Sequence, residues 1–129
     1  MTEPEGGRKY PQQVGIDAYG NGGFRFAGIS HRGSLLCLPS GMAAWQVPAG
    51  PLTLDALRPV LAEADTIDVL LIGLGMEIAP LAADVRQAFR DRSVIVEAIA
   101  TGGAVRTYNV LLAEQRAVAA ALIAVDRVR

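Results

Sequence analysis

The chain has 129 residues, 51% of them hydrophobic, and its 12 basic and 13 acidic residues leave a formal net charge of −1. This length suits one domain with a substantial core, and the balanced charge disfavours a nucleic-acid partner, which needs a basic face. One cysteine and one histidine exclude an internal disulfide and argue against a Cys/His zinc site within the chain. We therefore expect no metal, no cofactor and no nucleic acid.

The first 13 residues are polar, carry Glu, Gly and Pro, and lack the apolar core of a signal peptide. We expect residues 1–13 to be flexible and residues 14–129 to form a single domain. The longest apolar stretches, Val69–Met76 and Ala117–Val125, are too short to span a bilayer. These features predict a soluble protein of the cytoplasm, with no integral membrane segment.

The first third of the chain is predicted to form a β-hairpin or meander. Alternating apolar residues and glycine-rich turn signals favour short antiparallel strands. The expected pieces are a turn at Tyr19–Gly23, a strand at Phe24–Ser30, a tight turn at His31–Gly33, a strand at Ser34–Leu38 and a short extended piece at Gly41–Val47.

A change of period after Pro51 predicts a helix, because Leu54, Leu57, Leu61 and Ala64 fall on one helical face. Thr53 is a candidate N-cap. Pro59 lacks the N–H that a helix interior needs. We therefore expect a 3₁₀ or kinked first turn, with regular helix from about Arg58.

The middle of the chain predicts a strand–helix–strand unit. Ile67–Gly73 is almost wholly apolar, as in strands covered on both faces. A helix is expected from Pro80, with Ala79 as an N-cap that has no side-chain acceptor. Ser93–Ala100 forms the next strand, and such a unit places its two strands parallel and adjacent.

A second helix is expected after Thr101, since Ala104, Tyr108, Leu111 and Leu112 share one face. Thr101 stands where an N-cap would be. The run Arg116–Val125 is apolar throughout, so periodicity does not decide between helix and strand.

Two glycine-bearing turns form the candidate site. One is Gly73-Leu74-Gly75-Met76 and the other is Thr101-Gly102-Gly103, with Arg106 close behind it. Both follow parallel strands, and open α/β sheets bind ligands beyond the carboxyl ends of their strands. The third glycine of a dinucleotide motif is missing, and no phosphate-loop motif is present. The alternatives are a pocket for a small anion and glycines that only permit tight turns and close packing.

The remaining candidates have simpler interpretations. His31 is expected in an exposed turn, Cys37 as a buried apolar residue and Trp45 as a lid on the core. Glu97 interrupts an apolar strand, so it either faces solvent or is buried with an arginine partner such as Arg106 or Arg116. No nucleophile–histidine–acid arrangement can be assembled. The sequence therefore favours a protein without enzymatic activity.

The segments "IDVLLIGLG", "TGGAVRTYNVLLAEQRAVAAALI" and "GSLLCLP…W" resemble a family of small domains of unknown function. That family includes mitochondrial complex I assembly factor 3 and adipogenesis-associated animal proteins. The resemblance covers roughly Ile16 to Val125, and Leu74 departs from the threonine of many relatives. The matching positions are Gly73, Gly75, Thr101, Ala104, Thr107, Tyr108, Asn109, Glu114 and Arg116.

The resemblance implies a three-layer α/β fold with a central mixed, mostly parallel sheet and a smaller β-hairpin layer. It further implies that Ala117–Ile123 is a strand inserted antiparallel. The implied function is non-enzymatic interaction or assembly, assisting a respiratory, complex I-like membrane complex through a protein partner, with a homo-oligomer also allowed. The alternative is a binder of a small anionic ligand, or an enzyme, that uses the two turns. In that case Tyr108 and Asn109 join the candidate site as residues that hold loops through hydrogen bonds.

Overall fold

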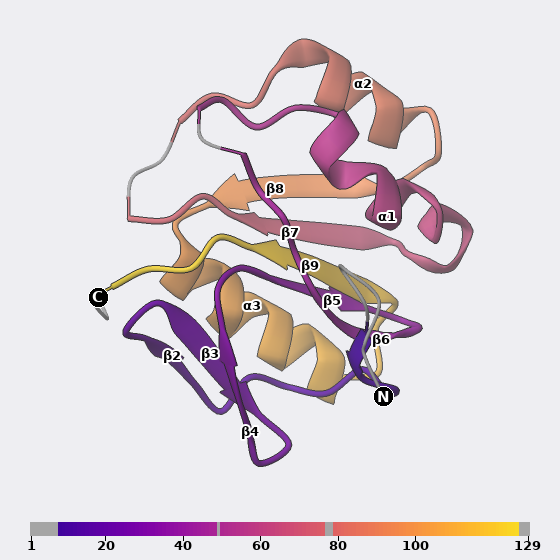
Figure 1. The fold of residues 1–129 in the computed structure, drawn as a ribbon. Helices are drawn as coiled ribbons and strands as arrows, with labels where there is room; N and C mark the ends of the chain where they lie inside the picture. Colours follow the sequence, from indigo (N-terminus) through magenta and orange to yellow (C-terminus); the bar gives the residue numbers. More distant parts are fainter. Residues whose placement is uncertain (1–7, 49, 77–78, 127–129) are drawn as a thin grey trace.

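The structure, a computed structural model, describes residues 8–48, 50–76 and 79–126 and has three layers (Figure 1). A six-stranded sheet lies in the middle, with two helices on one face and a longer helix and a three-stranded sheet on the other. This is the three-layer α/β fold that the family resemblance implied. The strands are β1 (Arg8–Tyr10), β2 (Ala18–Gly20), β3 (Gly23–Phe26), β4 (Ile29–Arg32), β5 (Leu35–Leu38), β6 (Gly41–Ala44), β7 (Val69–Gly73), β8 (Ile95–Ile99) and β9 (Val118–Leu122). The helices are α1 (Arg58–Leu61), α2 (Ala83–Arg90) and α3 (Thr101–Ala113), with 3₁₀ turns η1 (Asp55–Leu57) and η2 (Ala64–Thr66).

The large sheet is mixed, with the strand order β1-β6-β5-β9-β7-β8. β7 is parallel to β8, which confirms that the strands on either side of α2 are adjacent and parallel. β9 is parallel to β7 on one side and antiparallel to β5 on the other. The implied last strand is therefore confirmed, and its antiparallel pairing holds on the β5 side alone. β5, β6 and β1 pair antiparallel, so the parallel part is confined to β9, β7 and β8.

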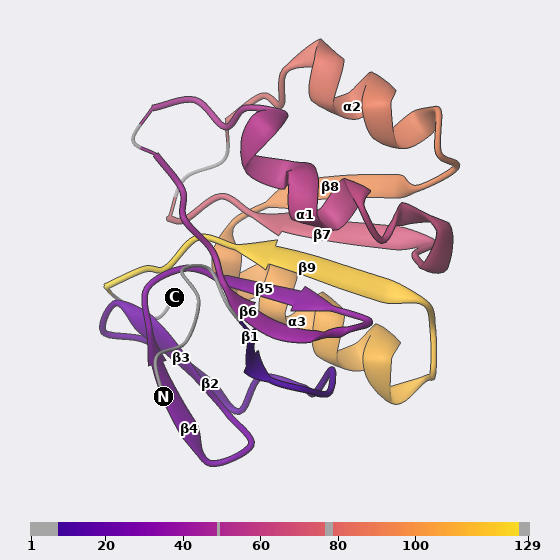
Figure 2. The ribbon, with the colours of Figure 1, turned by 45° about the vertical axis from the view of Figure 1, so that its right-hand side comes forward.

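Each face of the large sheet buries its own apolar cluster. Leu70 and Ile72 of β7 point toward α1 and α2, while Leu71 points toward α3 and the small sheet. β9 lies between both clusters and carries alanines at positions 119–121, all fully buried. Small side chains at the centre of the sheet allow helices on both faces to approach closely. Figure 2 shows the same layers from the side, with α3 beneath β9.

The small antiparallel sheet, β2-β3-β4, differs from the prediction. The expected single strand Phe24–Ser30 is two strands joined by a turn at Ala27–Gly28, where both residues have positive φ. Alanine is uncommon in that conformation, so Ala27 does not indicate a turn there. His31 consequently lies in β4 rather than in an exposed turn, and it is 6% exposed.

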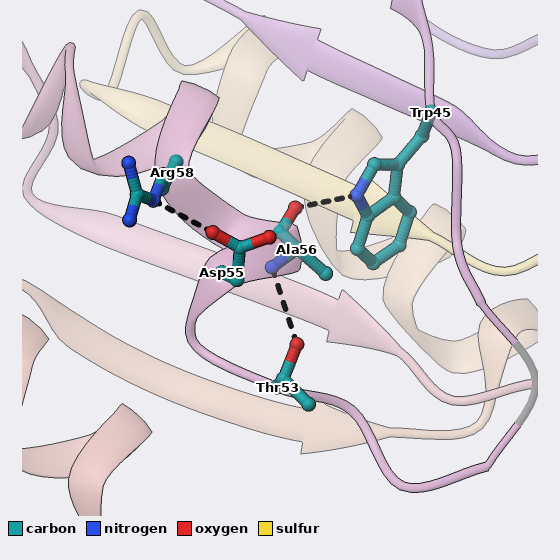
Figure 3. A network of polar contacts seen from close by, with 5 residues as sticks. All are labelled: Trp45, Thr53, Asp55, Ala56 and Arg58. Carbon is teal, nitrogen blue, oxygen red and sulfur yellow. Dashed lines mark hydrogen bonds and ion pairs between the residues drawn. The ribbon is translucent and has the colours of Figure 1, made fainter.

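The region before α1 confirms the effect expected of Pro59. A 3₁₀ turn, η1, precedes regular helix that starts at Arg58. Thr53 lies one residue before the N-cap, and its hydroxyl accepts a hydrogen bond from Ala56 N–H at 3.3 Å (Figure 3). Trp45 is a buried lid, as predicted, and its indole N–H donates to the Ala56 carbonyl oxygen at 2.8 Å.

Three boundaries differ from expectation. α1 ends at Leu61 and is followed by η2, so the face through Ala64 is not one continuous helix. α2 begins at Ala83 rather than Pro80. Residues 8–10, expected to be flexible, form β1 at the edge of the sheet, because pairing with β6 supplies order that composition does not reveal. Residues 1–7 lie outside the described part of the chain. Among the described residues, no helix is long and apolar enough to cross a membrane.

Candidate functional site

The two glycine-bearing turns meet, as the parallel pairing of β7 and β8 requires. Thr101 joins them. Its hydroxyl accepts a hydrogen bond from Gly75 N–H at 2.9 Å and donates to the Ile123 carbonyl oxygen at 2.7 Å. Its backbone N–H donates to the Gly75 carbonyl oxygen at 2.9 Å. The predicted N-cap role is wrong, since Ala100 is the N-cap of α3 and the Thr101 side chain serves the neighbouring turn instead.

Close packing explains the first glycine of this edge. A Cβ atom added at Gly73 would lie 2.9 Å from the Thr101 Cα and 3.1 Å from a Leu122 methyl group. Real Cβ atoms almost never approach backbone so closely, so any side chain at 73 would push β7 and α3 apart. Gly75 is required for a different reason, because its φ of +90° lies in the region that favours glycine.

A small cavity of about 130 Å³ lies between the turns. Gly75, Met76, Gly102, Gly103 and Arg106 line it, which is half of the predicted site. Tyr19, Ala100 and Val125 complete the lining. Gly73, Leu74 and Thr101 do not line it, and neither do Tyr108 and Asn109. The helix start expected at Pro80, with Ala79 as its N-cap, plays no part, because α2 starts at Ala83 and its N-cap is Ala82.

Tyr108 and Asn109 instead fix the segment before β2 against α3. The Tyr108 hydroxyl donates to the Val14 carbonyl oxygen at 2.7 Å. The Asn109 amide accepts from Ile16 N–H at 2.8 Å and donates to the Ile16 carbonyl oxygen at 2.9 Å, so it pairs with that residue as another strand would. Both side chains thus hold a chain segment, as expected, but they do so away from the cavity.

Cys37 and Tyr108 lie in the same buried cluster. Burial raises the pKa of the Cys37 thiol far above its ordinary value, and a hydrogen bond with Tyr108 offsets only part of this rise. Burial likewise raises the pKa of Tyr108, and the neighbouring thiol adds to the effect. Thiolate is the reactive form of cysteine, so this buried thiol is unsuited to redox or nucleophilic chemistry. The interpretation of Cys37 as a small buried apolar residue is confirmed.

The other titratable candidates do not assemble into a centre. Glu97 is exposed, which selects the first of its two alternatives. His31 is buried, with its Nε2 2.9 Å from the Ser34 carbonyl oxygen and its Nδ1 without a partner among the described residues. No group of three or more His, Cys, Asp or Glu side chains in the described ranges is placed to hold a metal ion.

Sequence reasoning missed part of the cavity lining. Tyr19 comes from β2, more than 80 positions before α3, so periodicity does not connect them. The available signal was the aromatic residue Tyr19 beside the turn "GNGG". In the structure its hydroxyl group lies against Gly102, where an added Cβ atom would collide with it. A second hollow, which no expectation from the sequence included, is lined by Arg86 and Arg90 of α2.

Comparison with known proteins identifies the family of the chain. A model of the family described as "protein of unknown function (DUF498/DUF598)" matches residues 16–123. The chain belongs to this family. An uncharacterized protein of Rhodobacter capsulatus is 40% identical over 108 residues, which cover 84% of this chain and 82% of that protein. The mouse NADH dehydrogenase [ubiquinone] 1 alpha subcomplex assembly factor 3 is 32% identical over 116 residues. That match covers 89% of this chain but 63% of the mouse protein.

Solved structures of similar proteins share the fold. A Bartonella henselae protein, described as an outer membrane protein, is 49% identical with a TM-score of 0.86, over 90% of this chain and 98% of that one. A Rhodopseudomonas palustris protein is 42% identical with a TM-score of 0.77, over 88% and 85% of the two chains. A Bordetella pertussis protein, described as an Mth938-like domain, is 27% identical with a TM-score of 0.75, over 99% and 92%.

Proposed function

We propose that this protein assists the assembly of a respiratory, complex I-like membrane complex by binding protein partners, without an enzymatic step. The observation that carries the proposal is the 32% identity with the mouse assembly factor, which extends over 89% of this chain. Homology to an assembly factor supports an assembly role of the same kind. The complex concerned and the partner are inferred from that relative.

The positions that marked the family resemblance support an interaction role over a catalytic one. Thr101 bridges two turns, Gly73 permits β7 and α3 to pack, and Asn109 holds Ile16. These residues maintain a scaffold and do not converge on an open pocket.

Deletion of the gene in the organism that encodes it tests this proposal. We expect less assembled NADH dehydrogenase on native gels and less NADH-driven respiration, with succinate-driven respiration unchanged as the internal control. Normal amounts of the assembled complex in the deletion strain would contradict the proposal. Cell fractionation of a tagged copy tests the accompanying proposal that the protein resides in the cytoplasm.

The cavity between the turns favours a second candidate, the binding of a small anion. Its volume of about 130 Å³ fits a group of phosphate or carboxylate size, and Arg106 supplies a positive charge. A thermal-shift screen with inorganic phosphate and short dicarboxylates tests it. A true ligand at 100-fold excess over its Kd stabilises the fold by about 2.7 kcal/mol. A flat screen, matched by an equally flat screen of Arg106→Gln, would leave the glycines as packing residues alone.

A further inference from the structure

β8 is the outermost strand on its side of the large sheet, and within the described residues it pairs with β7 alone. Ile95 N–H donates to the Asp68 carbonyl oxygen at 2.9 Å, and Leu74 N–H donates to the Ile99 carbonyl oxygen at 2.8 Å. Backbone groups of successive strand residues face opposite sides. The N–H and C=O groups of Val96 and Ala98 therefore face outward, where the described ranges of the chain supply no strand.

Two arginines of α2 overhang this edge. Val85 and Phe89 are the buried residues of α2, whereas Arg86 and Arg90, one turn apart, are exposed. A hollow of about 360 Å³ separates this flank from β8, lined by Arg86, Arg90, Ser93, Val94, Ile95 and Val96. Neither arginine forms an ion pair with another described residue. Figure 1 shows α2 running along β8 at the top of the molecule.

The face of β8 that points away from α2 carries two isoleucines and one glutamate. Ile95, Glu97 and Ile99 pair with Val69, Leu71 and Gly73, so they point to the face of the sheet that carries α3. α3 lies mainly over β7 and β9, and Ile95 is left 64% exposed. Exposure of a large apolar side chain on a strand with outward-facing backbone groups is a feature that proteins usually avoid.

We propose that the β8 edge binds an extended strand of a partner protein in which acidic side chains alternate with apolar ones. The backbone of that strand would bond to Val96 and Ala98. Its acidic side chains would lie beneath Arg86 and Arg90, where carboxylates can form charge-assisted hydrogen bonds. Its other side chains would cover Ile95 and Ile99, with a basic residue opposite Glu97.

Glu97 argues against a second copy of this chain as the occupant. A two-fold antiparallel pairing satisfies all four outward groups of Val96 and Ala98 only when its axis passes through residue 97. That register places Glu97 directly opposite its symmetry mate at a Cα separation of about 4.5 Å, where like charges are destabilising. In such a dimer the arginines of each α2 helix would face a β8 strand that presents no acidic side chain to them, because Glu97 points to the other face of the sheet.

The inference rests on the proposed function, because it assigns a surface to the protein partner, but its test uses no respiratory complex. The probe is a synthetic peptide, acetyl-Gly-Val-Glu-Lys-Glu-Val-Gly-amide, and the matched control exchanges the charges, acetyl-Gly-Val-Lys-Glu-Lys-Val-Gly-amide. Amide chemical shifts of the full-length, isotope-labelled protein are followed during titration. We expect the probe to shift the Val96 and Ala98 amides and to bind at least about tenfold more tightly than the control.

Variants make the outcome decisive. Arg86→Glu with Arg90→Glu should reverse the preference for the two peptides, whereas Arg116→Glu, which removes an exposed positive charge elsewhere, should leave it unchanged. Ala98→Pro should abolish binding and keep the native melting transition, since Pro removes an outward N–H. Equal binding of both peptides, shifts confined to other surfaces, or no shift at millimolar probe would overturn the proposal. If gene deletion lowers the amount of assembled complex but the peptide causes no shifts, this inference is wrong and the proposed function is retained. If the peptide binds as expected but gene deletion leaves the assembled complex unchanged, the proposed function is wrong and the binding edge is retained.

Discussion

Two edges of the large sheet invite comparison, the end where β7 and β8 turn into loops and the side where β8 has no neighbour. The end holds Gly73, Gly75, Gly102 and Gly103, yet its backbone groups bond internally through Thr101 and Gly75. The side is built from the plain strand Ile95–Ile99, yet it leaves backbone groups and two arginines without partners in the described chain.

The difference separates what maintains the fold from what remains available for binding. Glycine and threonine at the turns are there because strand, helix and the segment after β9 converge within a few ångströms. An edge strand needs no special residue to expose its hydrogen-bonding groups, because topology alone does so. Four perturbations test this difference between the two edges, and they are given in order of decreasing expected change in stability.

Thr101→Val should cost about 3 kcal/mol in the free energy of unfolding, since it leaves the buried Gly75 N–H and the partly buried Ile123 C=O without partners. Urea denaturation measures the loss. Thr101→Ser keeps the hydroxyl and serves as the control, with an expected loss below about 1 kcal/mol. Equal stability of the valine and serine variants would show that the bridge between the turns contributes little.

Gly73→Ala should cost about 2 kcal/mol, because the new methyl group meets the Thr101 backbone. Gly103→Ala is the matched control in the other turn. Its methyl group would approach only the end of the Ile99 side chain, at 3.3 Å, and alanine favours helix, so the change should stay within about 0.5 kcal/mol of zero. Comparable melting temperatures for the two variants would refute the packing explanation of Gly73.

The pH dependence of stability tests the buried cluster behind the turns. Burial raises the pKa of Cys37 above its ordinary 9.0 and that of Tyr108 above its ordinary 10.0, so the unfolded chain releases these protons first. The contribution of these two groups to stability should be constant below about pH 8 and fall above it, by up to about 1.4 kcal/mol per pH unit for each group. In Cys37→Ala the fall should begin about one pH unit higher, where Tyr108 of the unfolded chain ionises. Urea denaturation between neutral and alkaline pH records both curves, and an unchanged onset in the variant would contradict the assignment to Cys37.

Ala98→Pro should change the free energy of unfolding by less than about 1 kcal/mol, because the N–H that it removes faces outward. Glu97→Pro, one residue earlier, removes an N–H that faces β7 and should cost about 2 kcal/mol or more. The pair reports directly on which way each backbone group of β8 points. A larger loss for the Ala98 variant would mean that the outward side of this strand is already covered.

Much of the fold was accessible from the sequence, because its signals are local. A few neighbouring residues suffice to predict three elements: the apolar run predicts β7, Pro59 predicts the 3₁₀ turn before α1, and the helical face that includes Tyr108 predicts α3. β9 was ambiguous by propensity, since alanine favours helix, and the family resemblance alone assigned it as a strand. β1 was missed because its pairing with the distant strand β6 decides it. The turn at Ala27–Gly28 was missed because alanine rarely adopts a positive φ. The start of α2 was placed three residues too early.

The candidate site was predictable only in outline. Parallel strands bring their carboxyl ends together, so the meeting of the two turns followed from topology. The direction of the Thr101 side chain did not follow, and it converts a presumed helix cap into a bridge. The β8 edge left no mark in the sequence, because strand order in a mixed sheet depends on where β9 inserts.

The position of β9 has a consequence for folding during synthesis on the ribosome. Its residues, 118–122, are synthesised after every other described strand, yet they join β5 to β7 at the middle of the sheet. Until this segment leaves the exit tunnel, β5 with β6 and β7 with β8 are separate fragments with exposed apolar faces. The large sheet can therefore be completed only after residue 122 has left the exit tunnel, and a chain that stalls before residue 118 lacks the strand that joins β5 to β7.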